Sequence, residues 1–344
     1  MEQRTHRRLN PLTGEWVLVS AGRTRRPWRG LVESPATETR PSHDPECYLC
    51  PGNQRAGGAK NPDYAGTFGF DNDFAALDAQ PGCDDHESTT GLLVSRPEPG
   101  ICRVLCFSPR HDLTLAEMDH AGVLAVIDLW TEEYRNLGNN PAINHVQIFE
   151  NKGELMGCSN PHPHGQVWAQ RSIPDLPARE LQKTAEYFER NRRPLLGDYL
   201  QHELQAESRL VCHNDEFVAL VPFWAVWPFE ILVLPRKQVG SLQEFSESQR
   251  DGLADIVRQV TVRYDNLFQT SFPYSSGIHQ NPTDGAEHHG FTFHMHFFPP
   301  LLRSATVRKF MVGYEMLAGP QRDISPESAA QLLRSQHNTH FRQV

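Results

Sequence analysis

Residues 100–150 change their hydrophobic period from that of a strand to that of a helix and back again. Residues 101–107 form an apolar run that predicts a β-strand. Apolar side chains then recur at helical spacing from Leu115 to Leu137, which predicts an amphipathic helix. The Thr114 capping box, Thr-Leu-Ala-Glu, predicts the start of this helix, and Gly138 is its expected stop. Residues 144–150 are again strand-like.

The same succession returns in the second half of the chain. Residues 229–234 predict a strand, and a second capping box begins at Ser241. A helical stripe runs from Leu253 to Leu267. Residues 291–298 alternate, so we predict a strand with its phenylalanines and methionine facing the core.

The spacing of the two successions agrees. Pro109 and Pro235, which follow the first strands, are 126 residues apart, and His162 and His294 are 132 apart. The polar loop 283–290 can hold the extra residues. We therefore predict an α+β chain with an internal duplication of a strand–helix–strand–His-x-His unit. A chance likeness of two α+β segments is the weaker alternative. Three local patterns add a strand at residues 15–19 and helices at residues 179–193 and 326–335.

Composition and charge exclude several classes of protein. With 344 residues, 38% of them hydrophobic, the chain can bury a large core and form two domains. A net charge of −9 argues against a nucleic-acid binder. The polar start predicts no signal peptide, and no run approaches the roughly 18 apolar residues of a membrane helix. Seven irregularly spaced cysteines favour a reducing compartment, so we expect a cytoplasmic protein without membrane partners.

The segment from Asn160 to Trp168, Asn-Pro-His-Pro-His-Gly-Gln-Val-Trp, is the most distinctive in the chain. In an extended backbone His162, His164 and Gln166 share one face. The prolines lack an N–H, so an edge or the rim of a sheet suits the segment better than the centre. Such a face can hold a metal, attack a phosphate or do both; a solvated turn with incidental histidines is the alternative.

His164 is the candidate nucleophile. A neutral imidazole is a good nucleophile near pH 7 and can attack phosphorus. Gln166 is an uncharged hydrogen-bond donor on the same face. The preceding residues 157–159, Gly-Cys-Ser, can bring backbone N–H groups close to a phosphate. Together these features are compatible with a phosphate-transfer site.

Cys47 and Cys50 have the spacing of a metal knuckle and lie among prolines, so we predict a tight turn. A tetrahedral zinc needs two more ligands, for which His111 and His162 are the best candidates. A redox pair is one alternative, although in thioredoxin-like folds the motif starts a helix after a strand. Two free thiols in a loop are another, and the spacing leaves all three open.

A second metal site is predicted around His294 and His296, which share a strand face. His279 is a possible third ligand. His288 and His289 are rivals that are better explained as loop residues. Nitrogen donors do not separate zinc from iron. A polar strand face with hydrogen-bonded histidines is equally compatible with the pattern.

Residues 157–166 closely resemble the active-site signature of the galactose-1-phosphate uridylyltransferase family, within the histidine-triad superfamily. The resemblance covers nearly the whole chain, and no motif position departs from the family pattern. The further matching segments are residues 10–14, 26–28, 43–47, 61–64, 72–74, 149–151, 227–230, 264–268 and 308–315.

The resemblance implies a fold, an assembly and a reaction. The fold is an α+β duplicated histidine-triad-like unit, mainly an antiparallel sheet with helices packed against it. Its halves are residues 1–176, with the catalytic His-Pro-His and the zinc site, and residues 177–344, with the second metal site. The expected homodimer draws each active site from both subunits. His164 is expected to take UMP from UDP-glucose, release glucose 1-phosphate, and pass UMP to galactose 1-phosphate to give UDP-galactose.

The resemblance also assigns roles to residues. It implies zinc ligands at Cys47, Cys50, His111 and His162, and iron ligands, with zinc as a substitute, at Glu180, His279, His294 and His296. No pattern in the sequence indicates Glu180 independently. The implied substrate contacts are Arg23, Arg26, Asn72, Asp73, Asn151, Gly157, Ser159, Gln166, Lys309, Phe310, Tyr314, Glu315 and Gln321.

Gln166 stands where histidine-triad hydrolases have a third histidine. A hydrolase must protonate a poor leaving group, whereas a sugar 1-phosphate leaves readily as an anion. We therefore expect Gln166 to hydrogen-bond the phosphate without activating water. The alternatives are a related nucleotidyl-histidine enzyme with another substrate, a metal-stabilised module that only binds nucleotide sugars, and a redox protein that uses Cys47 and Cys50.

Overall fold

The computed structural model describes residues 4–20, 40–80, 84–301 and 308–343. At its centre is a nine-stranded sheet in which each neighbouring pair is antiparallel. This arrangement confirms the predicted α+β class and antiparallel sheet. From one edge to the other, the strands are β3 (Phe68–Asp71), β6 (Gly100–Cys106), β8 (His164–Gln170), β7 (His145–Lys152), β12 (Tyr274–His279), β13 (His294–Phe298), β11 (Ile231–Pro235), β10 (Phe217–Leu220) and β9 (Leu210–His213).

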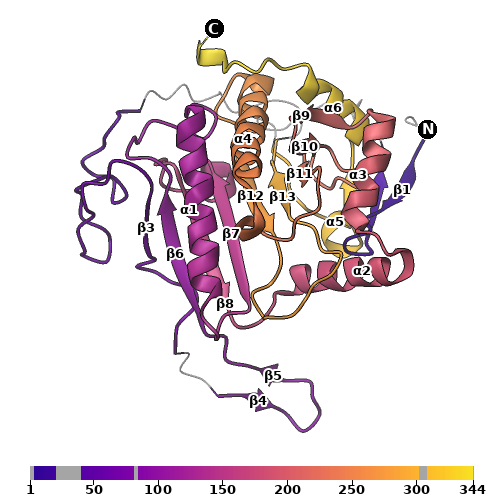
Figure 1. Cartoon of the computed structure of the whole chain (residues 1–344), viewed down its shortest axis with the longest axis horizontal. Helices are drawn as coiled ribbons and strands as arrows, with labels where there is room; N and C mark the ends of the chain where they lie inside the picture. Colours follow the sequence, from indigo (N-terminus) through magenta and orange to yellow (C-terminus); the bar gives the residue numbers. More distant parts are fainter. Residues whose placement is uncertain (1–3, 21–39, 81–83, 302–307, 344) are drawn as a thin grey trace.

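The strand order is symmetric about the central pair β7–β12. On one side lie β8 and then β6, and on the other lie β13 and then β11. α1 (His120–Gly138) follows β6, α4 (Glu247–Phe268) follows β11, and the two helices pack side by side on one face (Figure 1). This symmetry confirms the predicted duplication. The boundary at residues 176 and 177 stays a prediction, because one sheet runs through both halves.

Neither long helix starts at the capping box predicted for it, although α1 does end at Gly138. α1 is capped by Asp119 and α4 by Ser246. Thr114 and Ser241 each begin an isolated turn, in which the hydroxyl donates to the glutamate three residues further on. The prediction was wrong because this residue pattern stabilises a short turn as well as a helix end.

The His-Pro-His segment lies at the rim of the sheet but not at its edge. β8 begins at His164 and is an interior strand between β6 and β7. Pro161 and Pro163 precede the strand, and Pro163 contributes only its carbonyl, which accepts from the N–H of Phe107. The prolines therefore remove no hydrogen bond from the ladder. The rim prediction was correct, and the edge prediction was wrong.

The two faces of the sheet are covered differently in the two halves. On one face, α1 and α4 bury apolar side chains of both halves in a single core. On the other face, α3 (Leu195–Ala206) covers β10 and β11, and α2 (Asp175–Asn191) brings Glu180 next to β12 and β13. Beside β7 and β8, this second face borders open clefts. The functional site is therefore expected on the uncovered part of this face.

The smaller elements confirm the three local predictions. β2 (Trp16–Val19), α2 and α6 (Pro326–Arg334) correspond to the predicted strand and helices. β2 pairs with β1 (His6–Leu9) and, in parallel, with β14 (Gln321–Arg322), so the chain ends are joined in a second small sheet.

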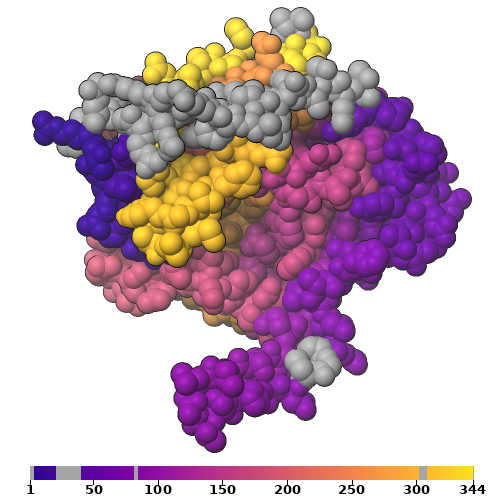
Figure 2. All heavy atoms as spheres, turned by 180° about the vertical axis from the view of Figure 1, so that it is seen from behind, coloured from indigo at the N-terminus to yellow at the C-terminus, as the bar shows by residue number. Residues whose placement is uncertain are grey.

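Two features stand out from the body of the molecule. β4 (His86–Glu87) and β5 (Val94–Ser95) form a hairpin arm that projects away from it (Figures 1 and 2). The single-turn helix α5 (Tyr314–Leu317) carries large exposed side chains before β14.

Short 3-10 turns occur at Glu154–Met156, Leu242–Glu244 and Phe341–Gln343. Within the described ranges, no helix has the length and apolar character needed to cross a bilayer.

Candidate active site and metal centres

Two thiols and two imidazoles meet beside the start of β8. Cys47 and Cys50 lie on a turn, as predicted, and face His111 and His162. Cys50 Sγ is 3.6 Å from His111 Nδ1 and 3.5 Å from His162 Nδ1, and all four ligand atoms lie within 4.8 Å of one another. Atoms bound about 2.0–2.3 Å from a tetrahedral ion lie about 3.3–3.8 Å apart. The cluster therefore fits a tetrahedral metal.

The surroundings of this first cluster favour a metal over a redox pair. His162 Nε2 lies 2.9 Å from the Ser108 carbonyl, which can only accept, so this nitrogen carries the proton and Nδ1 is left for a metal. Burial raises the pKa of the Cys50 thiol to about 12, whereas a reactive redox thiol has a lowered pKa. A bound cation is what stabilises thiolates in such a place. The redox interpretation therefore lacks the electrostatics it needs.

A glutamate and three histidines form the second cluster. α2 supplies Glu180, β12 supplies His279, and β13 supplies His294 and His296. Glu180 Oε2 accepts from His279 Nδ1 at 2.7 Å and lies 3.3 Å from His294 Nε2. His296 is 7% exposed, and among the described residues neither of its ring nitrogens has a hydrogen-bond partner. Buried nitrogens without partners fit metal ligands rather than a polar strand face.

The charges of the second cluster are compatible with a divalent ion. Burial disfavours the charged form of Glu180, but the charges and hydrogen bonds of His279 and His294 together outweigh burial and hold the pKa of Glu180 well below its ordinary range. Burial lowers the pKa of His296, and repulsion from His279 and His294 acts in the same direction. An anionic oxygen beside imidazole nitrogens suits zinc and iron alike. The identity of the metal is therefore left open by this geometry.

The rival histidines of the loop do not join either cluster. His288 Nε2 lies 2.9 Å from Asp284, and His289 Nε2 lies 2.9 Å from Glu287. These pairs lie in the loop that precedes β13, and the imidazole of His289 is largely exposed. Both residues are loop residues, as expected.

His164 is the first residue of β8 and lies on the face opposite α1, since the alternate residues Val167 and Ala169 enter the core. Its Nδ1 is 2.7 Å from the His162 carbonyl, which can only accept, so Nδ1 carries the proton and Nε2 has the free lone pair. Burial lowers the pKa of His164, and the bond to the carbonyl opposes this effect. The ring is therefore neutral at pH 7 and suited to nucleophilic attack.

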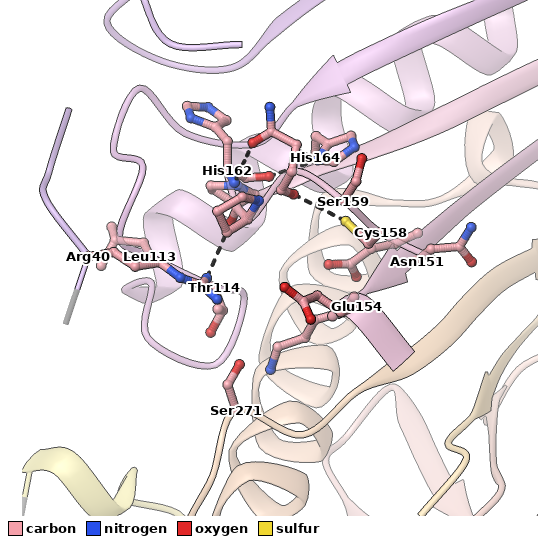
Figure 3. A pocket seen from close by; sticks show the side chains of 16 residues that line it. Arg40, Leu113, Thr114, Asn151, Glu154, Cys158, Ser159, His162, His164 and Ser271 are labelled. Atoms are coloured by element: carbon pink, nitrogen blue, oxygen red, sulfur yellow. Dashed lines mark hydrogen bonds between the residues drawn. The ribbon is translucent and has the colours of Figure 1, made fainter. Parts of the chain in front are cut away.

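His164 lies where two clefts adjoin, one of which is shown in Figure 3. Asn151 and Ser159 line both clefts, and Gly157 and Gln166 line the second. The structure thus places four of the implied substrate contacts beside the candidate nucleophile. Their role as contacts stays a prediction.

The backbone N–H groups of Gly157 and Cys158 do not serve as expected. They donate to the carbonyls of Glu154 and Gly153 and close the 3-10 turn Glu154–Met156. Gly157 has a φ of 78°, a conformation that favours glycine, so its place in the sequence is explained by this turn. The turn thus already uses two of the three N–H groups that were expected near a phosphate, and the expectation stays a prediction for the N–H of Ser159.

Other implied contacts in the first half lie away from the clefts. Asn72 and Asp73 follow β3, where their side chains accept backbone N–H groups of Phe74 and Gly57. Neither residue lines a cleft that contains His164. Arg23 and Arg26 lie outside the described residues.

The implied contacts in the second half form a separate group near α5. Lys309 pairs with Glu315, and Gln321 donates to Asp323 at 2.7 Å. Within the described ranges, none of the group lines the clefts around His164 of the same chain. The group consists of Lys309, Phe310, Tyr314, Glu315 and Gln321.

Several residues that line the clefts were missed in the sequence, among them Arg40, Tyr48 and Lys152. Arg40 Nη1 lies 3.4 Å from the Pro161 carbonyl and reaches the cleft shown in Figure 3. Tyr48 and Lys152 line the second and first clefts, respectively. Tyr48 lies between two candidate zinc ligands, and Lys152 follows the implied contact Asn151. These neighbours in the sequence could have indicated that both residues lie near the site. Nothing in the local sequence around Arg40 indicated its place.

Fold and site together define the class of the protein. A duplicated strand–helix–strand unit carries a His-x-His at the same place in each half. In one half the second histidine borders an open cleft, and in the other it is buried in a cluster of metal-ligand type. These are the features of a duplicated α+β protein whose two halves carry different kinds of site.

The chain belongs to the galactose-1-phosphate uridylyltransferase family. Residues 1–174 match the family model of the galactose-1-phosphate uridyl transferase N-terminal domain, and residues 180–344 match that of the C-terminal domain. Its activity is that of a galactose-1-phosphate uridylyltransferase, an enzyme of the transferase class.

Curated relatives carry this likeness over almost the full chain. The galactose-1-phosphate uridylyltransferase of Rattus norvegicus is 50% identical over 342 residues, which cover 98% of this chain and 89% of the relative. That of Haemophilus influenzae is 48% identical and covers 98% of this chain and 96% of the relative. That of Hypocrea jecorina is 48% identical, and the match covers 96% of this chain and 95% of the relative.

Solved structures share the fold. One described as the structure of uridylyltransferase covers 96% of this chain and 98% of its own at a TM-score of 0.77, with 21% identity. A second is an ADP-glucose phosphorylase from Arabidopsis thaliana with bound ADP-glucose. It covers 97% of this chain and 100% of its own at a TM-score of 0.76, with 21% identity.

Proposed function

We propose that the chain exchanges UMP between UDP-glucose and galactose 1-phosphate through a covalent uridylyl group on His164. The products are glucose 1-phosphate and UDP-galactose, as in galactose metabolism. The observation that carries this mechanism is the state of His164. Its ring is neutral, its proton is held on Nδ1 by the His162 carbonyl, and the ring borders a cleft.

In the first half-reaction, His164 Nε2 attacks the α-phosphorus of UDP-glucose. The bond from this phosphorus to the oxygen of glucose 1-phosphate breaks, and glucose 1-phosphate leaves with the bonding electrons. The new P–N bond makes the ring cationic. The proton stays on Nδ1, and its hydrogen bond to the His162 carbonyl stabilises the positive charge of the ring. In the second half-reaction, a phosphate oxygen of galactose 1-phosphate attacks, the P–N bond breaks, and the ring is neutral again.

Gln166 is suited to bind the phosphate without acting as an acid or base. It lies on the same face of β8 as His164, two residues further on. The Trp168 indole N–H donates to Gln166 Oε1 at 3.2 Å, so the amide NH₂ is the end left for a phosphate oxygen. An amide neither supplies a proton to a leaving group nor activates water. The uridylyl group therefore persists until a sugar phosphate accepts it.

The two clusters are proposed to hold one metal ion each. The first, Cys47, Cys50, His111 and His162, suits zinc, and the second suits iron or zinc. Both metals act structurally: they add binding energy to the fold and keep their ligands in place. His162 joins the zinc site to the nucleophile, because its ring belongs to the cluster and its carbonyl holds the Nδ1 proton of His164.

A homodimer is proposed because the implied substrate contacts near α5 do not line the clefts that contain His164 of their own chain. The segment around α5 exposes large apolar side chains, with Met316 73% and Leu317 89% exposed. Such a patch is typical of an interface. We infer that this segment docks on a second copy, where Lys309 and Glu315 reach that copy's His164.

The described cysteines are free thiols, which favours a reducing compartment such as the cytoplasm.

The test is to trap the covalent intermediate. The protein is incubated with UDP-glucose, ADP-glucose or GDP-glucose, and its intact mass is measured. We expect one uridylyl group per chain from UDP-glucose alone, its loss when galactose 1-phosphate is added, and no adduct on His164→Ala. An adenylyl adduct would instead favour a nucleotide-sugar phosphorylase. The absence of any adduct, with unchanged binding by His164→Ala, would favour a module that only binds nucleotide sugars.

A further inference from the structure

The seam between the two halves lies one strand away from β8, which carries His164. β7 of the first half pairs with β12 of the second, and in their register Asn151 lies opposite Ser275. Asn151 lines both clefts that contain His164. A residue of the second half is therefore the direct neighbour of a side chain in the candidate active site.

Ser275 makes a short hydrogen bond across this seam. Its hydroxyl donates to Asn151 Oδ1 at 2.6 Å. An amide has one accepting end and one donating end, and the two ends differ only by a half-turn of the side chain. Because the hydroxyl engages the oxygen end, the NH₂ end is the one left for a ligand. A phosphate group carries only acceptors, so this orientation is the favourable one for a phosphate.

The backbone around Asn151 is fixed by other bonds to the second half. Glu150 accepts from the Tyr274 hydroxyl at 3.0 Å, and Lys152 pairs with Asp265 at 2.9 Å. Both neighbours of Asn151 are thus bonded to the second half, Glu150 to β12 and Lys152 to α4. The remaining freedom at this position is the rotation of the Asn151 side chain, which Ser275 restrains.

We propose that Ser275 is a positioning residue that orients the Asn151 amide so that its NH₂ group faces the phosphate of the substrate. The proposal deepens the proposed function, because it rests on Asn151 as a substrate contact. It assigns the second half a direct part in the geometry of the site beside His164. Ser275 acts through Asn151 and does not itself touch the reacting atoms.

The test compares five variants by steady-state kinetics with UDP-glucose and galactose 1-phosphate. Ser275→Ala removes the donor, and Ser275→Thr keeps it on a side chain that strands accept. Ser276→Ala removes a hydroxyl from the next residue, which points to the opposite face and is buried. Asn151→Ala removes the amide, both alone and combined with Ser275→Ala. Thermal unfolding of each variant checks that the fold is intact.

We expect Ser275→Ala to lower kcat/KM about tenfold, as for one hydrogen bond that positions a reacting group. Ser275→Thr should restore most of this loss, and Ser276→Ala should stay within about twofold of wild type. In the Asn151→Ala background, Ser275→Ala should cause no further loss, because the group through which it acts is absent.

Two results would overturn the proposal. One is a Ser275→Ala variant as active as wild type while Asn151→Ala is impaired. The other is an equal loss from Ser275→Ala with and without Asn151, which would mean that the two residues act independently. In either case the wild-type protein still forms the uridylyl adduct, so the failure of this inference is distinguishable from the failure of the proposed reaction.

Discussion

His164 and His296 stand at equivalent places in the two halves, and their surroundings decide what each can do. Both lie on the face of their strand that is turned away from the long helices. Beside His164 this face borders a cleft, and its ring keeps a lone pair on the outer nitrogen. Over His296, Glu180 of α2 closes the same face, and the ring is enclosed with two other imidazoles. One covering helix thus separates a histidine that borders a cleft from a histidine that is enclosed in a cluster of metal-ligand type.

The first prediction at the residue scale concerns Gln166. We expect Gln166→His to raise the hydrolysis of UDP-glucose, on the order of tenfold, because an imidazole can supply a proton and activate water where the amide cannot. Release of glucose 1-phosphate without an acceptor is the measurement. Gln166→Ala is the control: it should weaken transfer without raising hydrolysis. Unchanged hydrolysis by a folded Gln166→His protein would contradict the role given to Gln166.

The second prediction concerns the buried Glu230. Its carboxylate accepts from the N–H groups of Val226 and Trp227, but burial outweighs these bonds and raises its pKa to about 7 from an ordinary 4.5. Between these two pH values the unfolded chain has lost the proton and the folded chain keeps it. The free energy of unfolding therefore falls as pH rises through this window, by roughly 3 kcal/mol from this group.

Glu230→Gln should remove this fall, since one amide oxygen can accept both N–H groups and carries no charge. Urea unfolding of wild type and variant at pH 5 and pH 8 measures the difference. Glu189→Gln, which replaces an exposed carboxylate, is the control and should keep the wild-type pH dependence. The prediction fails if Glu230→Gln shows the same loss of stability between the two pH values as wild type.

At the scale of elements, short turns do as much to build the site as strands do. The turn from Cys47 to Cys50 brings two thiols to two histidines that come from separate parts of the chain. The 3-10 turn at Glu154–Met156 uses the N–H groups of Gly157 and Cys158, which precede the His-Pro-His segment, and fixes the approach to β8. β8 itself needs only its regular alternation to place His164 and Gln166 side by side.

Removal of one zinc ligand should release the metal and weaken the fold. We expect Cys50→Ser to lose one metal ion per chain and to lower the free energy of unfolding by at least about 3 kcal/mol, because metal binding adds to folding. Metal analysis and chemical denaturation measure the two effects. Cys212→Ser replaces another buried thiol and should keep its metal. Full metal content in folded Cys50→Ser would exclude Cys50 as a ligand.

At the scale of the whole molecule, the duplication creates a seam between the two halves of one chain. The exposed segment around α5 is proposed to form a second contact, between two chains. Inside the chain, β7 and β12 pair so that the second half reaches the cleft of the first. Outside it, the proposed dimer would bring Lys309 and its neighbours to the His164 of a second copy. A complete site would then draw on three partners: the first half, the second half and another chain.

This arrangement predicts complementation between inactive variants. His164→Ala and Lys309→Ala should each be impaired, but after unfolding and refolding together their mixture should recover about a quarter of wild-type activity. Half of the dimers are then mixed, and each mixed dimer has one complete site. A mixture of His164→Ala and Gln166→Ala is the control and should recover nothing, because both residues belong to the same cleft of one chain. If the first mixture also recovers nothing, Lys309 does not act on the other chain.

The sequence by itself determined the features that depend on near neighbours in the chain. The hydrophobic periods identified the long helices and the strands around them, and the matching spacing identified the duplication, because backbone alternation is a local property. The Cys47–Cys50 turn and the His-x-His pairs were visible for the same reason. The capping boxes misled, because the same local bonds also close an isolated turn.

Only the tertiary structure decided which of these features meet. Cys50 and His162 lie 112 residues apart, and Glu180 and His279 lie 99 apart, and no local pattern relates such distances. Glu180 entered through the resemblance alone, and Arg40 was not foreseen. Whether a histidine is open or enclosed depends on which helix covers its face of the sheet, and that is set by packing between distant segments. The residue types indicated which side chains could act as nucleophile or metal ligand. The fold decided which of them border a cleft and which lie in a metal-ligand cluster.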